Sequence, residues 1–196
     1  IPADIMKKAK ELGLFGLSVP EEYGGLGLSM VGKVAILEEL GRTHNGFTTV
    51  IGGHTGIGGG GIVEMGAEEQ KRKYLPDMAT GDRIGAFALT EPEAGSHASN
   101  LKTTAVRKGD KYILNGRKHF ITNATIADIF TAMAVTDPTK GPKGITSFIV
   151  ERGTPGLIIG KKEKKMGLRG SHTAEIIFED CEVPAENVLG EEGHGY

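Results

Sequence analysis

The 196-residue sequence predicts an α+β protein of two domains, a helical domain at residues 1–83 and an all-β domain at residues 84–190. In the first part, apolar residues recur every three or four positions, which is the spacing of one buried helix face. In the second part, short alternating runs follow one another closely, and the dipeptides Gly109-Asp110 and Asn115-Gly116 are typical hairpin turns. Such closely spaced strands favour a β-sandwich or barrel. The change of period places the domain boundary near Arg83.

Glycines and one serine mark the expected helix ends. Ile5 and Leu12 lie on one face of a first helix, which stops at Gly13. Ser29 suits the N-cap of a second helix, and Gly41 its end. The expected helices cover residues 5–12, 30–40, 47–65 and 67–78, with an ordered loop at 14–28.

The expected strands are short and rich in residues that favour an extended chain. They cover residues 84–90, 102–106, 111–114, 117–122, 129–135, 146–150 and 175–178.

Two stretches of the β part carry the features of a ligand site. In Phe87-Ala-Leu-Thr-Glu-Pro-Glu-Ala-Gly-Ser96 an apolar strand leads into a tight turn that supplies hydroxyl groups and lets the backbone approach a ligand closely. On the strand at 117–122, alternation would put Lys118, Phe120 and Thr122 on one face. We expect an aromatic ring beside a hydroxyl group there, as one wall for a flat heteroaromatic cofactor.

These residues resemble a known family. The motifs Leu89-Thr-Glu-Pro-Glu-Ala-Gly-Ser-His97 and Gly116-Arg-Lys-His-Phe-Ile-Thr-Asn123 are similar to the two flavin-binding signatures of the acyl-CoA dehydrogenases, closest to the long- and very-long-chain branch. Three further segments match in the family's order, so the resemblance spans nearly the whole chain. They are Val19-Pro-Glu-Glu-Tyr-Gly-Gly-Leu-Gly27, Lys165-Met-Gly-Leu-Arg-Gly-Ser171 and Val183-Pro-Ala-Glu-Asn-Val-Leu-Gly190.

The resemblance implies FAD as cofactor and α,β-dehydrogenation of fatty acyl-CoA thioesters as the reaction. It places Gly95 and Ser96 near the pyrophosphate, Ser96 also near the substrate, and Phe120 on the flavin ring where many members carry tryptophan. Thr122 would hydrogen-bond near the flavin N5. The cofactor-binding residues implied are Phe87, Leu89, Thr90, Gly95, Ser96, Phe120, Ile121 and Thr122.

Two features depart from the family. His97 stands where the signature usually has aspartate. The family's catalytic glutamate belongs to a C-terminal helical bundle that is absent here, so we expect no catalytic residue in this chain. We expect residues 191–196 to be the entry to that bundle, and both ends of the chain, beginning at Ile1, to be cut.

The glycine run Gly56-Ile-Gly-Gly-Gly-Gly61 has two interpretations besides close helix packing. It matches the dinucleotide fingerprint G-x-G-x-x-G, but the charged segment after it does not suit a buried parallel strand. In the acyl-CoA dehydrogenases the equivalent helix borders the acyl tunnel. The resemblance therefore makes Gly58 and Gly61 substrate-binding candidates and favours a medium to very long acyl chain.

Composition and the resemblance bound the remaining expectations. The net charge of -2 gives no basic surplus for nucleic acid, and the single cysteine, Cys181, fits a structural role in a reducing compartment. The six histidines lack metal-ligand spacing, so we expect no metal. No signal peptide or membrane-spanning run is evident, which fits bacterial cytoplasm or mitochondrial matrix. The expected partners are acyl-CoA, electron-transfer flavoprotein and further copies in a homodimer or homotetramer.

Two alternative functions stay open. One is another flavoenzyme on the same scaffold, a flavin monooxygenase or nitroalkane oxidase. The other is a truncated, non-catalytic module that binds flavin or acyl-CoA, or takes part in assembly.

Overall fold

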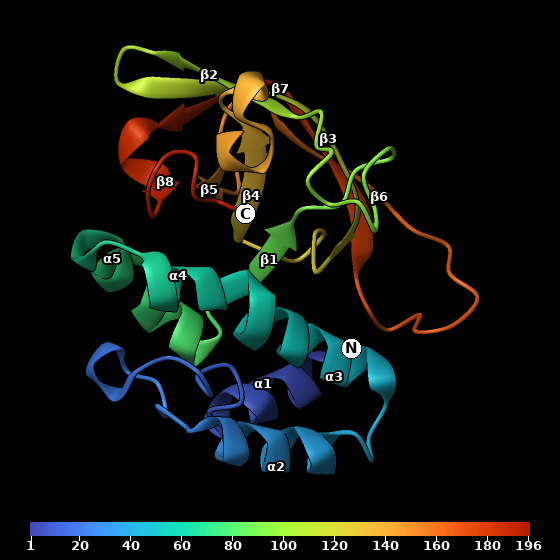
Figure 1. Ribbon diagram of the computed structural model, residues 1–196. Helices are drawn as coiled ribbons and strands as arrows, with labels where there is room; N and C mark the ends of the chain where they lie inside the picture. The colour runs from blue at the N-terminus through green and yellow to red at the C-terminus, as the bar shows by residue number, and fades with distance from the viewer.

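The α-helices occupy the first 80 residues and lie together on one side of the sheet (Figure 1). The computed structural model describes residues 1–196. Gly13 follows the first helix with a φ of +70°, which favours glycine, and the Ser29 hydroxyl accepts a hydrogen bond from the Gly32 amide at 3.3 Å. The helices are α1 (Ala3–Glu11), α2 (Met30–Leu40), α3 (Asn45–Gly52), α4 (Gly59–Met65) and α5 (Glu68–Thr80), with a short 3₁₀ turn, η1 (Glu21–Tyr23).

The helix expected at 47–65 is present but contains a π-helical segment, η2 (Gly53–Gly58), between α3 and α4. Such π turns occur frequently at functional sites. The glycine run therefore lies inside a helix and not at a strand-to-helix turn, which excludes the dinucleotide fingerprint.

The strands form one eight-stranded sheet in the order β6-β7-β3-β2-β4-β5-β8, with β1 parallel to β4. The fold class is confirmed, as is the hairpin at Gly109-Asp110, where Lys108 pairs with Lys111. The strands are β1 (Gly85–Ala88), β2 (Thr104–Lys108), β3 (Lys111–Thr122), β4 (Ile129–Val135), β5 (Ile145–Glu151), β6 (Leu157–Lys162), β7 (Thr173–Pro184) and β8 (Val188–Leu189).

The hairpin expected at Asn115-Gly116 is wrong, because β3 runs through it without turning. The pairing of β3 with β7 shifts register between Leu114 and Gly116. A Cβ on Gly116 would lie 2.4 Å from the Thr103 hydroxyl oxygen, so glycine is needed for close approach. Strand β7 is longer than predicted, and strands β6 and β8 are absent from the prediction.

The helices and the sheet share one apolar core, in which Phe15 and Ile51 join Phe130 and other sheet residues. Ion pairs also join the two parts. The carboxylate of Glu151 in β5 lies 2.6 Å from the guanidinium group of Arg83 and 2.8 Å from the ammonium group of Lys73. Partial burial opposes ionisation of this carboxyl group, but these cations outweigh it and lower the pKa of Glu151 to about 2. The domain boundary near Arg83 stays a prediction.

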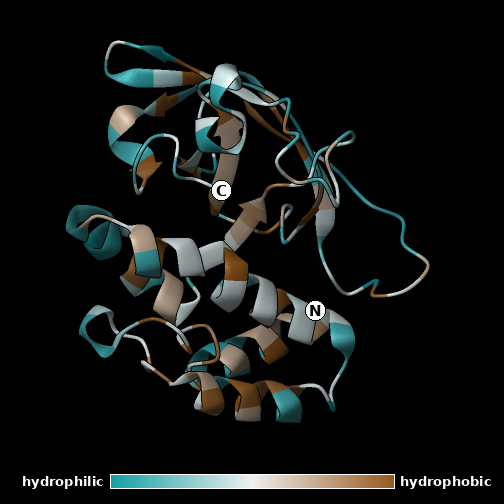
Figure 2. Cartoon of the chain, viewed as in Figure 1, coloured by the Kyte–Doolittle hydropathy of each residue, from teal (hydrophilic) through white to brown (hydrophobic).

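Helix α2 lies on the outside of the molecule and carries apolar residues there (Figure 2). It has no buried residue, and Met30, Val31 and Val34 are all more than half exposed. No helix of the structure combines the length and the apolarity that crossing a bilayer requires.

His54 ties the π-helical segment to its neighbours. Its Nδ1 accepts a hydrogen bond from the Gly85 amide at 2.8 Å, so its Nε2 carries the hydrogen and donates to the Met78 carbonyl at 3.0 Å. Burial lowers the pKa of His54 to about 4, which keeps the ring neutral at pH 7.

Because His54 is buried and neutral, we expect the folded protein to lose stability as the pH falls. The pKa of His54 is lower in the folded than in the unfolded state, so its contribution is complete above pH 6.5 and is lost as the pH falls toward 4. From this gap we expect the free energy of unfolding to fall by on the order of 3 kcal/mol between pH 6.5 and 4. Urea titrations across this range should show that the free energy of unfolding depends less on pH in His54→Asn than in the wild-type protein. The control variant His97→Asn, altered on an exposed loop, should follow the wild-type curve; equal slopes for all three proteins would contradict the assignment.

Candidate active site

Two strand ends and the π-helical segment enclose a cavity of about 130 Å³. Thr90 follows β1, Thr122 ends β3, and both residues line this same cavity. The cavity joins six of the eight predicted cofactor-binding residues with two from η2. Its lining consists of Gly53, Ile57, Phe87, Leu89, Thr90, Phe120, Ile121 and Thr122.

Phe120 provides the aromatic wall through an unusual backbone conformation. It has a φ of +56°, is 62% exposed, and stacks on the His119 ring with the centroids 4.1 Å apart. For a bulky side chain this left-handed conformation is strained, and an exposed ring offers little burial in return. Strain of this kind is common where a ligand binds, so the conformation of Phe120 makes the cavity a candidate binding site.

The predicted common face of Lys118, Phe120 and Thr122 is wrong for Lys118. The β3–β7 pairing shifts register between Lys118 and Ile121, because a bulge interrupts the regular alternation. Phe120 and Thr122 line the cavity, whereas Lys118 is fully buried in the interior.

Gly95 and Ser96 lie apart from this cavity, on the exposed loop that follows β1. Glu91 and Ala94 exchange backbone hydrogen bonds of 3.0 and 3.2 Å at the base of this loop. This bridge closes a turn at Pro92 and Glu93, and Gly95 and Ser96 follow it, both exposed. The roles of Gly95 and Ser96 stay predictions.

Gly58 and Gly61 both face protein atoms. A Cβ on Gly58 would lie 2.8 Å from the carbonyl group of Gly85, and one on Gly61 would lie 3.1 Å from a Leu189 methyl group. By contrast, a Cβ on Gly56 or Gly60 would meet open space. The geometry favours close packing as the reason for glycine at 58 and 61, and their predicted substrate role remains untested.

Three residues at or beside the cavity are not among those predicted from the sequence. Gly53 and Ile57 line the cavity because of a π turn that carries no clear local signal. Asn123 is buried at the end of the second signature, and its side-chain amide donates to the carbonyls of Val50 at 3.1 Å and Gly85 at 3.4 Å. The motif itself was the available signal for Asn123, which joins α3 to β1 beneath the cavity.

No group of acidic, histidine or cysteine side chains in the structure is arranged to hold a metal ion. Cys181 is fully buried, and burial, with a smaller effect of Glu182, raises the pKa of its thiol to about 12. A thiol of this kind is not reactive at neutral pH, which is consistent with a structural role.

Comparison with protein-family models identifies both parts of the chain. Residues 1–82 match the model described as the acyl-CoA dehydrogenase N-terminal domain, and residues 86–181 match the model of its middle domain. The chain belongs to the acyl-CoA dehydrogenase family. The resemblance of the two signature motifs is thereby confirmed.

Members of this family are similar along the whole of this chain. An acyl-CoA dehydrogenase of Bacillus subtilis is 49% identical over all of the chain and 52% of its own length. The human mitochondrial very long-chain specific acyl-CoA dehydrogenase is 47% identical over 95% of the chain and 30% of its own length. The crystal structure of a Bacillus anthracis acyl-CoA dehydrogenase complexed with FAD has a TM-score of 0.91 and 47% identity, covering 98% of this chain and 33% of that one. The chain thus spans about half or less of the length of these relatives.

Proposed function

We propose that the cavity binds the isoalloxazine ring of FAD and that the protein takes part in α,β-dehydrogenation of fatty acyl-CoA thioesters. The observation that carries the proposal is the exposed, strained Phe120 ring beside Thr90 and Thr122 in one cavity. Similarity to a relative solved with FAD supports it.

The residues present suit a flavin. Phe120 offers an aromatic face for stacking, and the partly exposed Thr90 and Thr122 hydroxyls can each donate to or accept from a ring heteroatom. Phe87, Leu89 and Ile121 add apolar side chains to the lining, against which the ring would pack. Gly95 and Ser96 would hold the pyrophosphate, with Ser96 also close to the substrate. When bound, FAD supplies the hydride acceptor that no side chain can provide.

No residue of this chain is proposed as the catalytic base. Glu91, the carboxylate closest to the cavity in sequence, is occupied by two backbone amides and an ammonium group. Glu93 lies exposed on the loop away from the cavity. We propose that the base comes from a helical domain beyond the residues described.

The first test is anaerobic addition of acyl-CoA to the FAD-loaded protein, made at the full length that its gene encodes. We expect acyl-CoA to reduce the flavin, so that its visible absorbance bleaches. Flavin that stays oxidised with acyl-CoA but is reduced by a nitroalkane would favour the nitroalkane oxidase alternative. Flavin that stays oxidised with acyl-CoA, and is reduced only by an added external reductant before it consumes oxygen, would favour the monooxygenase alternative. Protein that binds FAD and does neither would favour the non-catalytic module.

The acyl length is a finer proposal. The glycine-rich helix η2–α4 leaves open space at Gly56 and Gly60, which supports a medium to very long acyl chain. Turnover that is greatest with palmitoyl-CoA is expected, whereas activity that peaks on butyryl-CoA and falls with length would contradict it.

We further propose electron-transfer flavoprotein as the acceptor of the electrons and a homodimer or homotetramer as the assembly. Reoxidation of the reduced protein by purified electron-transfer flavoprotein, and light scattering for the mass, test these two points separately.

A further inference from the structure

A buried ion pair contacts the backbone of a residue that lines the proposed flavin cavity. The ammonium group of Lys118 meets the carboxylate of Glu91 at 2.8 Å, with the two side chains 0% and 3% exposed. Burial lowers the pKa of Lys118, and burial also opposes ionisation of Glu91, whose pKa is nevertheless lowered by Lys118. Backbone N–H donors to Glu91 favour its charged form further.

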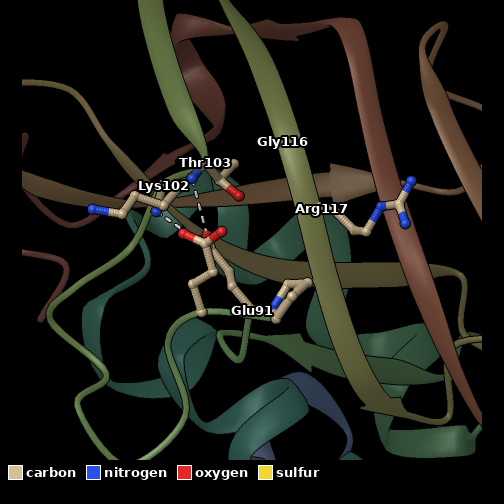
Figure 3. A pocket seen from close by; sticks show the side chains of 7 residues that line it. Glu91, Lys102, Thr103, Gly116 and Arg117 are labelled. Carbon is tan, nitrogen blue, oxygen red and sulfur yellow. Dashed lines mark hydrogen bonds between the residues drawn. The ribbon is translucent and has the colours of Figure 1, made fainter.

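The pair holds three backbone groups from two separate segments. The Glu91 carboxylate accepts from the amides of Lys102 at 2.6 Å and Thr103 at 3.0 Å, and Lys118 also donates to the Leu89 carbonyl at 3.1 Å (Figure 3 shows the carboxylate and its two amide donors). One residue along, the His119 amide donates to the Thr90 carbonyl at 2.8 Å. The strand that carries Phe120 is therefore joined to the strand end that carries Leu89 and Thr90.

A second, polar cavity lies beside the ion pair, but the pair is not part of an anion-binding site there. That cavity, of about 150 Å³, is lined by Glu91 and Thr103 and by the basic residues Lys102 and Arg117. Figure 3 shows the charged ends of Lys102 and Arg117 pointing away from Glu91. The only ion-pair partner of Glu91 is Lys118.

A stability role alone is a weak explanation as well. Replacing a buried ion pair by apolar residues of similar size is often neutral or stabilising, because desolvation opposes the Coulomb attraction. What apolar side chains could not do is donate a hydrogen bond to the Leu89 carbonyl or accept two from the Lys102 and Thr103 amides.

We propose that Glu91 and Lys118 are positioning residues of the flavin site, which hold the Leu89–Thr90 wall at a fixed separation from the Phe120 bulge. This inference rests on the proposed function. Neither side chain lines the flavin cavity, so both act through the backbone that does.

The test measures FAD affinity and thermal stability in three variants of the full-length protein. We expect Lys118→Met and Glu91→Gln each to raise the FAD dissociation constant at least 10-fold and to lower the melting temperature. In Glu91→Gln/Lys118→Met, removal of both charges should recover much of the melting temperature, while the dissociation constant stays at least 10-fold raised because Leu89 still lacks its donor. The matched control is Lys111→Met, on the same strand and ion-paired with Glu182 at 2.6 Å but partly exposed; its affinity should stay within twofold of wild type.

Two outcomes would overturn the inference. One is wild-type affinity in the folded variants, and the other is affinity that recovers together with stability in the double variant, as a purely structural role requires. If Lys118→Met fails to fold by circular dichroism, the double variant decides. Wild-type protein that binds no FAD overturns the proposed function along with this inference, whereas wild-type binding with unaffected variants overturns the inference alone.

Discussion

Replacing Gly58 with alanine is expected to destabilise the protein by about 2–3 kcal/mol, since a Cβ would overpack a tight backbone contact. That Cβ would lie 2.8 Å from the Gly85 carbonyl group and equally close to the Gly53 carbonyl oxygen. Backbone atoms cannot move aside as a flexible side chain could, so helix and strand must separate. For a chain of this size the loss corresponds to a fall of roughly 5–10 °C in melting temperature, measurable by calorimetry.

Gly60→Ala provides the matched control. Gly60 lies two residues further along the same helix, where a Cβ would meet nothing within 4 Å. Alanine there should stabilise the helix by up to about 1 kcal/mol. If Gly58→Ala were as stable as Gly60→Ala and merely shifted the preferred acyl length, the packing explanation would be wrong and the tunnel interpretation correct.

Replacing Phe120 with glycine is expected to weaken FAD binding about 10- to 30-fold, from the loss of ring stacking and buried apolar area. The same change should leave the stability of the cofactor-free protein within about 1 kcal/mol of wild type, because glycine relieves the left-handed strain. Fluorescence titration with FAD and thermal unfolding without FAD measure the two effects independently.

Leu168→Gly is the control for this variant. Leu168 has a φ of +50° and is 48% exposed, so glycine relieves the same kind of strain outside the cavity. We expect unchanged FAD affinity there. A Phe120→Gly variant that binds FAD as wild type does would show that the ring serves another purpose.

Features of the fold that depend on neighbouring residues in the sequence could be predicted, whereas features that depend on distant residues could not. Helix ends at Gly13 and Gly41 could be predicted because helix termination depends on a few neighbouring residues. The same local reasoning failed at Asn115-Gly116, where the need for glycine comes from Thr103, a residue brought close only by the fold. Strand β6 was missed because two of its six residues are lysines and none of the six is buried, and β8 because it has only two residues.

The site shows the same division. The two signature motifs identified Thr90, Phe120 and Thr122, and the fold brings these residues to one cavity. Lys118 was assigned to the wrong face because the bulge depends on pairing with β7, which alternation cannot reveal. The need for glycine at Gly58 likewise comes from Gly85, 27 residues away in the chain.

The most direct test of the central claim is a crystal structure of the full-length protein with FAD. The isoalloxazine ring should lie against Phe120, within hydrogen-bonding distance of the Thr90 and Thr122 hydroxyls. Electron density for the ring at another place on the protein, with this cavity filled by solvent alone, would contradict it.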